Sequence, residues 1–176
     1  MRRAMFLLAA MATVILVAAG IALAVEKTGT NSGETLRGTA QRDILYGRGG
    51  NDRLLGLGGN DELLAGSGND TLQGSSGADE LYGTSGADSM NGGDDNDGVY
   101  GGVGDDPAIF GGGGTDDISG GWGDDTLNSR DNSPNDSVSC GPNQDVANVD
   151  DDPATPADPN DSIDIVSPDC EDVNPG

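Results

Sequence analysis

The chain has 176 residues, of which 31 are acidic and eight are basic, with 31 glycines, 3% aromatic residues and no histidine. A formal charge of −23 repels nucleic acid and anionic lipid, so neither is expected as an electrostatic partner, and it attracts divalent cations. The lack of histidine excludes catalytic triads with a histidine base and zinc sites with histidine ligands.

Residues 1–24 are predicted to form an export signal. A positive start at Arg2 and Arg3 is followed by an almost wholly apolar stretch and by the small-x-small cleavage pattern Ala-Leu-Ala, so we expect cleavage after Ala24. The alternative is an uncleaved anchor, because the apolar run of residues 4–25 is long enough to span a bilayer. Both interpretations place the remaining chain outside the cell, as a secreted or membrane-anchored protein.

A nine-residue period follows a short polar lead-in at residues 25–37 and continues through residues 38–128. Each unit reads Gly-x-x-Gly-x-Asp-x-apolar-x, and the units begin at Gly38, Gly47, Gly56, Ala65, Gly74, Gly83, Gly92, Gly101, Gly111 and Gly120. A period of this length predicts a solenoid, in which each coil contacts only its neighbours.

Aspartate occupies the sixth position of every unit, and an apolar residue occupies the eighth. The aspartates are Asp43, Asp52, Asp61, Asp70, Asp79, Asp88, Asp97, Asp106, Asp116 and Asp125. The eighth positions are Leu45, Leu54, Leu63, Leu72, Leu81, Met90, Val99, Ala108, Ile118 and Leu127. If two units complete one coil, the aspartates form two rows, one from Asp43 to Asp116 and the other from Asp52 to Asp125.

Ala65 opens the fourth unit and Asp95 replaces the fourth-position glycine of the seventh, but two other departures affect the predicted sites. The first unit has Gln41 where its fourth glycine belongs, so Asp43 is expected to form half of a site. The eighth unit carries Pro107 after its aspartate and one extra residue, which we assign to Phe110. Proline and an inserted residue together predict a bulge in that strand.

The units resemble the RTX-type calcium-binding nonapeptide repeat, Gly-Gly-x-Gly-x-Asp-x-apolar-x, most closely in the segments GRGGNDRLL, GLGGNDELL and GGWGDDTLN. The resemblance implies that the first six residues of a unit form a turn with half of a metal site and that the last three form a short strand. It also implies that two units complete one coil of a parallel β-roll, with the ten aspartates as calcium ligands.

The residue types support calcium independently of the resemblance. Glycine reaches positive φ at low cost, and calcium takes about six to eight oxygens from carboxylates and carbonyls. The alternatives are Asx turns that bind nothing and a Gly/Asp/Asn linker that never folds, but neither places an apolar residue two positions after each aspartate. Because so small a core cannot offset the entropy of ordering the repeats, we expect an expanded region that compacts when calcium binds.

Residues 129–176 are predicted to form a C-terminal cap. The period fades there, but the segments after Asp136 and Asp145 keep an Asp-then-Val cadence that is typical of a degenerate repeat. Terminal repeats of solenoids need such caps to cover the last apolar layer. The acidic, Pro-rich stretch at residues 150–161 is predicted to be a loop.

Cys140 and Cys170 are the only cysteines. In an exported chain, two cysteines favour a disulfide, which would staple the C-terminal cap. The alternative, a reactive thiol pair or a metal site, lacks support because the sequence has no Cys-x-x-Cys motif and no histidine.

No enzymatic activity and no small-molecule substrate are predicted. Glycoside hydrolysis needs a walled cleft and a carboxyl with a raised pKa, and a thin solenoid with a single tryptophan offers no such cleft. Residues 94–98 superficially resemble an EF-hand loop, but Gly93 and Gly104 stand where its first ligand and its bidentate glutamate belong.

The sequence therefore predicts an all-β protein: a parallel β-roll, or β-solenoid, of about ten nonapeptide repeats with a disulfide-stapled C-terminal cap. The predicted function is calcium binding outside the cell by a roll that folds on the ion. The alternative is a calcium-stiffened scaffold that presents a face to cell wall, ice or another protein. The second and third positions give only Thr39, Thr84 and Trp122 for such a face, so no flat recognition surface is predicted from them.

Overall fold

The computed structural model describes residues 24–130, 135–149, 165–170 and 172–175, which form strands and turns without a helix. The predicted export signal, apart from Ala24, and the predicted Pro-rich loop lie outside these ranges. In the described part of the chain, no helix could cross a membrane.

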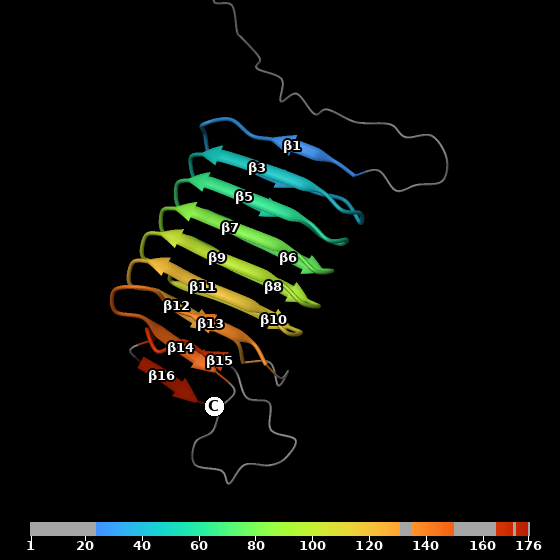
Figure 1. Ribbon diagram of the computed structural model, residues 1–176. Helices are drawn as coiled ribbons and strands as arrows, with labels where there is room; N and C mark the ends of the chain where they lie inside the picture. The colour runs from blue at the N-terminus through green and yellow to red at the C-terminus, as the bar shows by residue number, and fades with distance from the viewer. Residues whose placement is uncertain (1–23, 131–134, 150–164, 171, 176) are drawn as a thin grey trace, which may run out of the picture.

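The strands form two parallel sheets of eight strands each, and every strand pairs with the strand two places along the chain. The first sheet contains β1 (Glu26–Thr28), β3 (Ile44–Gly49), β5 (Glu62–Ser67), β7 (Glu80–Ser85), β9 (Gly98–Val103), β11 (Asp117–Trp122), β13 (Ser137–Ser139) and β15 (Ile165–Val166). The second contains β2 (Thr35–Arg37), β4 (Arg53–Leu55), β6 (Thr71–Ser76), β8 (Ser89–Asp94), β10 (Ala108–Gly113), β12 (Thr126–Asn128), β14 (Val146–Val149) and β16 (Asp172–Pro175). Two strands complete one coil, so the chain is a parallel β-roll (Figure 1), as predicted.

The core is a narrow column of apolar side chains between the two sheets. Side chains alternate across a strand, so in β2 to β14 the second residue of each strand points inward and the residues on either side of it point outward. In the first sheet, for example, Leu45 stacks on Leu63, which stacks on Leu81. The inward residues are Leu36, Leu45, Leu54, Leu63, Leu72, Leu81, Met90, Val99, Ile109, Ile118, Leu127, Val138 and Ala147. The eighth position of the repeat thus builds the core, at about 2 kcal/mol for each Leu-sized side chain.

The predicted register of the eighth unit was wrong by one residue. Ile109 pairs with Met90 and is fully buried, whereas Ala108 lies one place earlier and is only half-buried. The extra residue therefore lies at Pro107, before the strand begins, and not at Phe110, which points outward with 40% of its surface exposed. Isoleucine buries more apolar surface than alanine, and proline outside the strand leaves no gap in the hydrogen-bonded ladder.

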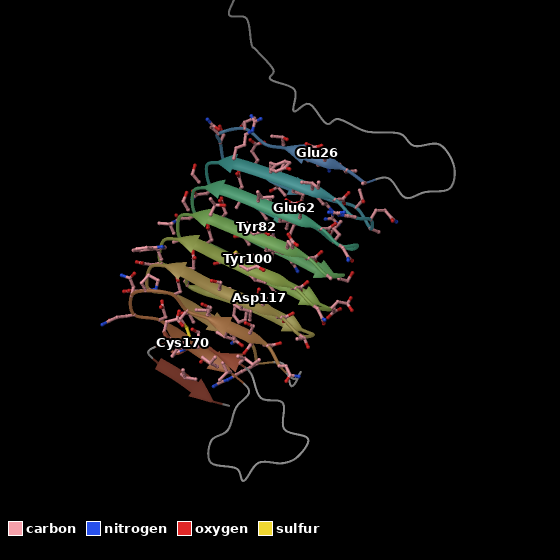
Figure 2. The ribbon with its side chains drawn as sticks, viewed as in Figure 1. Glu26, Glu62, Tyr82, Tyr100, Asp117 and Cys170 are labelled. Atoms are coloured by element: carbon pink, nitrogen blue, oxygen red, sulfur yellow. A yellow bond between two sulfur atoms is a disulfide. The ribbon has the colours of Figure 1, made fainter. Side chains whose placement is uncertain are left out.

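The roll extends beyond the predicted array at both ends. The lead-in forms β1 and β2, which pair with β3 and β4, and the C-terminal segment forms β13 to β16. The predicted disulfide joins Cys140 and Cys170, with the Cα atoms 5.0 Å apart (Figure 2). Closing a loop of 30 residues stabilises this end by about 3–4 kcal/mol on the chain-entropy account.

Candidate metal centre

From the unit of Gly47 onward, the turns that join the strands have left-handed backbone at the second and fourth positions. The fourth position is held by glycines such as Gly50 and Gly59, with φ of 93° and 96°. At the second position, left-handed φ also occurs in Leu57 (86°) and Thr84 (82°), where a side chain makes this conformation strained. The glycines of the repeat are therefore required by the shape of the turn.

The sixth-position aspartates form two hydrogen-bonded rows, which we call the Asp ladders. In each rung, the backbone N–H of one aspartate donates to Oδ1 of the aspartate one coil further along, as from Asp61 to Asp79 at 2.7 Å. One ladder runs Asp43, Asp61, Asp79, Asp97, Asp116 and Asp136. The other runs Glu34, Asp52, Asp70, Asp88, Asp106, Asp125 and Asp145. All ten predicted site aspartates thus lie in two rows, as expected from the period.

Three members of these ladders were absent from the predicted site. Asp136 and Asp145 are buried and accept from the amides of Asp116 and Asp125 at 2.8 Å each. The Asp-then-Val cadence after residue 128 was the signal for both of them. Glu34 stands in the aspartate position of the lead-in, where no glycine-rich motif marks it.

The second carboxylate oxygen, Oδ2, has no hydrogen-bond partner in most of the ladder. This holds for Asp52, Asp61, Asp70, Asp79, Asp88, Asp97, Asp106 and Asp125, whose Oδ2 atoms are buried. Their side chains are at most 4% exposed. A buried carboxylate oxygen without a partner is costly, so these turns require a proton or a cation that the protein itself does not supply.

The first-position glycines let these oxygens lie close to the backbone, where a Cβ atom would clash with them. A Cβ on Gly83 would lie 2.5 Å from Oδ2 of Asp88 and 2.6 Å from the carbonyl oxygen of Gly101 in the next coil. On Gly47, it would lie 2.7 Å from Oδ2 of Asp52. These glycines do not have positive φ, so they are required for space. A carboxylate oxygen and a main-chain oxygen of the next coil therefore both lie beside first-position glycines such as Gly83 and Gly47.

Burial raises the pKa of Asp52, Asp61, Asp70, Asp79, Asp88, Asp97, Asp106 and Asp125, against the opposing effect of the hydrogen bond from the preceding coil. The pKa is raised to about 7 for Asp61, to about 8 for Asp97 and to about 7 for Asp106. It is raised to about 6 for Asp79, Asp88 and Asp125. Neighbouring carboxylates add to the shift in each of these residues. Near neutral pH the metal-free ladders are thus poised to take up positive charge.

Side chains alone do not complete a metal site. Among the described residues, no three acidic, cysteine or histidine side chains gather as a metal-binding group, so main-chain carbonyls would have to supply further ligands. Such carbonyls are present: those of Gly50 and Gly59 point at Gly68 and Gly77 in the next coil. A hard cation suits an all-oxygen set of this kind, which calcium accepts and zinc, with its preference for nitrogen and sulfur, does not.

Asp43 differs from the rest of its ladder. Its Oδ2 accepts a hydrogen bond from the backbone N–H of Thr39 at 2.5 Å and another from the Thr39 hydroxyl at 2.9 Å. The structure therefore places all ten predicted aspartates together but gives the first of them a protein partner.

The fold and its turns define a class: parallel β-rolls of nonapeptide repeats with oxygen-lined turns. The family model of the RTX calcium-binding nonapeptide repeat (4 copies) matches residues 28–63, 55–90, 64–99, 73–106 and 108–128, which is more than half of the chain. The chain belongs to this family, whose repeats bind calcium ions, and the resemblance seen in the sequence is confirmed. No curated protein matches the sequence.

Proposed function

We propose that this protein is a secreted, non-enzymatic β-roll that binds calcium along both Asp ladders and folds as it does so. The observation that carries this proposal is the series of buried Oδ2 atoms without a partner in both ladders. The proposed ligands are the ladder aspartates from Asp52 onward, with turn carbonyls. When bound, calcium would neutralise the buried carboxylates and tie successive coils together.

Coupling between binding and folding follows from the charges in the ladders. Without an ion, the rows carry like charges in buried positions, and six basic residues against 31 acidic ones beyond residue 25 cannot neutralise them. The free energy of binding then becomes free energy of folding. Outside the cell, calcium concentrations fill sites with dissociation constants of about 10⁻⁴–10⁻³ M, which supports an extracellular role.

Isothermal titration with CaCl₂ and small-angle scattering test this proposal, with MgCl₂ as the control ion. We expect several calcium ions to bind and the radius of gyration of residues 25–176 to fall from about 40 Å, the unfolded value, to below about 20 Å. No heat of binding, or equal dimensions in EDTA and in calcium, would contradict the proposal. For secretion, mass spectrometry of protein from the medium should find Val25 at the N-terminus, and an intact Met1 there would refute cleavage.

A second function, that of a scaffold which presents a face, is favoured by the outer surface of the second sheet. In β6, β8, β10 and β12, the outward residues on either side of the core position stack in two rows that carry no charge, and the exposed Asp94 lies at the end of β8. One row is Thr71, Ser89, Ala108 and Thr126, and the other is Gln73, Asn91, Phe110 and Asn128. These are seventh and ninth positions of the repeat, which differ from the second and third positions considered in the sequence.

The opposite outer surface is acidic. On the first sheet, Glu80 accepts a hydrogen bond from the hydroxyl of Tyr82 at 2.9 Å, and this bond is the main cause that raises the tyrosine pKa to about 12. Tyr82 stacks on Tyr100, with ring centroids 5.1 Å apart, and Tyr100 donates to Asp117 (Figure 2). The uncharged rows of the second sheet therefore differ from the acidic outer surface of the first sheet.

An uncharged polysaccharide is the partner that fits the second sheet. Amide and hydroxyl side chains donate and accept hydrogen bonds without charge, and Phe110 offers an apolar platform beside a hollow of about 270 Å³ lined by Gln73, Ser89 and Asn91. The rows repeat about every 4.8 Å, the spacing of neighbouring strands, so an extended chain would meet equivalent groups along the roll.

Co-sedimentation with insoluble cellulose or chitin in calcium buffer tests this second function. We expect Phe110→Ala together with Asn91→Ala to reduce the bound fraction at least several-fold. The matched control is Trp122→Ala, which removes an exposed aromatic side chain from the other sheet and should bind like wild type. Equal loss in both variants, or no binding by wild type, would overturn the assignment of this face.

A further inference from the structure

In the first coil of the roll, the carboxylates of Glu34 and Asp43 accept hydrogen bonds from residues of their own turns. Thr39 donates its backbone N–H and its hydroxyl to Oδ2 of Asp43, four residues later. Thr30 donates the same two groups to Oε1 of Glu34, also four residues later, with the backbone bond at 2.6 Å. The same device thus occurs once on each edge of the roll, in its first two turns.

The backbone of these two turns differs from that of the later turns. The second and fourth positions are left-handed in the later units, as in Thr84 and Gly86, with φ of 82° and 132°. Thr30 and Thr39 do not have positive φ, and neither does Gln41 at the fourth position. A threonine at the second position is therefore not sufficient: Thr84 is left-handed, and Oδ2 of Asp88 in its unit has no partner.

We propose that the first coil is a metal-free cap, in which Thr30 and Thr39 take the place that an ion takes in later turns. This inference rests on the proposed calcium function. Glu34 and Asp43 then act as structural acceptors and not as ligands, and the calcium sites begin with Asp52 and Asp61. The cap remains joined to the ladders, because the N–H groups of Glu34 and Asp43 still donate to Oδ1 of Asp52 and Asp61 at 2.8 and 2.7 Å.

Such a cap meets a need at the end of the roll. A solenoid that ended on a calcium turn would leave its first site with ligands from one coil only, whereas hydrogen bonds within a single turn need no preceding coil. The cap also covers the first core layer, where Leu36 lies against Leu54 and is only 8% exposed. The backbone conformation at the second and fourth positions then decides whether a turn takes an ion.

The number of calcium ions bound by the full chain, measured by isothermal titration, tests the cap. Asp43→Asn should leave this number unchanged, whereas Asp61→Asn, one coil along the same ladder, should lower it by at least one. Circular dichroism in saturating calcium checks that both variants fold. A loss of an ion in Asp43→Asn would overturn the cap while leaving the proposed calcium function in place.

A gain-of-site variant keeps the inference testable if Asp43→Asn does not fold. The double substitution Thr39→Gly with Gln41→Gly restores glycine at both left-handed positions and removes the hydroxyl donor, so it should bind one more ion than wild type. The matched control is Thr71→Gly, an exposed strand position outside every turn, which should bind the wild-type number. An unchanged number in the double variant contradicts the cap, and the absence of calcium binding in wild type contradicts both proposals.

Discussion

Replacement of Asp88 by asparagine should have opposite effects on stability with and without calcium. The asparagine keeps the backbone N–H that donates to Oδ1 of Asp106 at 2.7 Å, and its side-chain carbonyl oxygen can still accept the 2.8 Å bond from the backbone N–H of Asp70. What changes is Oδ2, which lies beside Gly83 and becomes an uncharged NH₂ group. The substitution therefore removes a charge while it preserves the rung.

The magnitude follows from the pKa of Asp88. Burial raises this pKa from 3.8 to about 6, and the hydrogen bond from Asp70 lowers it in part. The folded state then holds more protons than the unfolded state between these two values, so metal-free stability falls as the pH rises through that window. Above it, the shift of about two units corresponds to a cost of about 3 kcal/mol. Asparagine escapes this cost, so Asp88→Asn should stabilise the metal-free fold by up to that amount.

Two titrations at pH 7.5 followed by far-UV circular dichroism measure the effect. In EDTA, trimethylamine N-oxide drives folding, and Asp88→Asn should need less of it than wild type. In a calcium titration, the same variant should need at least about tenfold more calcium, a loss of ~1.4 kcal/mol, because it lacks one charged ligand. A variant that is less stable than wild type in EDTA as well would refute the reasoning.

Asp105→Asn is the matched control. Asp105 is exposed, immediately precedes Asp106 in the next rung of the ladder, and accepts the amide of Asp124 at 3.0 Å through an oxygen that asparagine retains. Asparagine already occupies the equivalent fifth position at Asn51 and Asn69. The control should stay within about 0.5 kcal/mol of wild type in both titrations.

Three further predictions follow from the ladders and the disulfide. Calcium affinity should fall between pH 8 and pH 5.5, because protons compete for Asp61 and Asp97, whose pKa values are raised to about 7 and about 8; titration calorimetry that shows a constant affinity would contradict this. Gly83→Ala places a methyl group against Oδ2 of Asp88 and should cost about 1–3 kcal/mol in calcium buffer, measured by urea unfolding; an unchanged midpoint would show that the space is not needed. Replacing both Cys140 and Cys170 by alanine should destabilise the C-terminal coils by about 3–4 kcal/mol and speed hydrogen exchange in residues 137–149; unchanged exchange would assign the disulfide no role there.

Most of the fold could be predicted because each position of the repeat has one structural role, and the residue type at that position indicates the role. The sixth and eighth positions alone indicated the two Asp ladders and the core column, and both are observed. The insertion in the eighth unit was misplaced because Ala108 and Ile109 are both apolar, and only burial decides which of them fills the core. When one residue is inserted, the repeat spacing alone does not determine whether Ala108 or Ile109 is the core residue.

The capping coils were harder to predict, because they keep the hydrogen-bond geometry of the repeat with different residues. Glu34 replaces aspartate and Thr30 replaces the glycine of the second position, so no motif marks the lead-in, although its strands pair in register with β3 and β4. Likewise Cys140 stands where a first-position glycine would be, with its carbonyl oxygen next to Gly120. The outward rows of the second sheet were missed for another reason: their residue types vary, and what they share is the absence of charge.

The spacing of the aspartates shows that the rung, and not the length of the loop, sets the register of the roll. Successive aspartates of a ladder are 18 residues apart at Asp79 and Asp97, 19 apart at Asp97 and Asp116, and 20 apart at Asp116 and Asp136. The corresponding N–H to Oδ1 distances are nonetheless 2.8, 2.9 and 2.8 Å. Extra residues are therefore absorbed between the rungs, while the aspartates align the coils through Oδ1. If Oδ2 binds the ion, as proposed, a single asparagine should remove ion binding and keep the alignment.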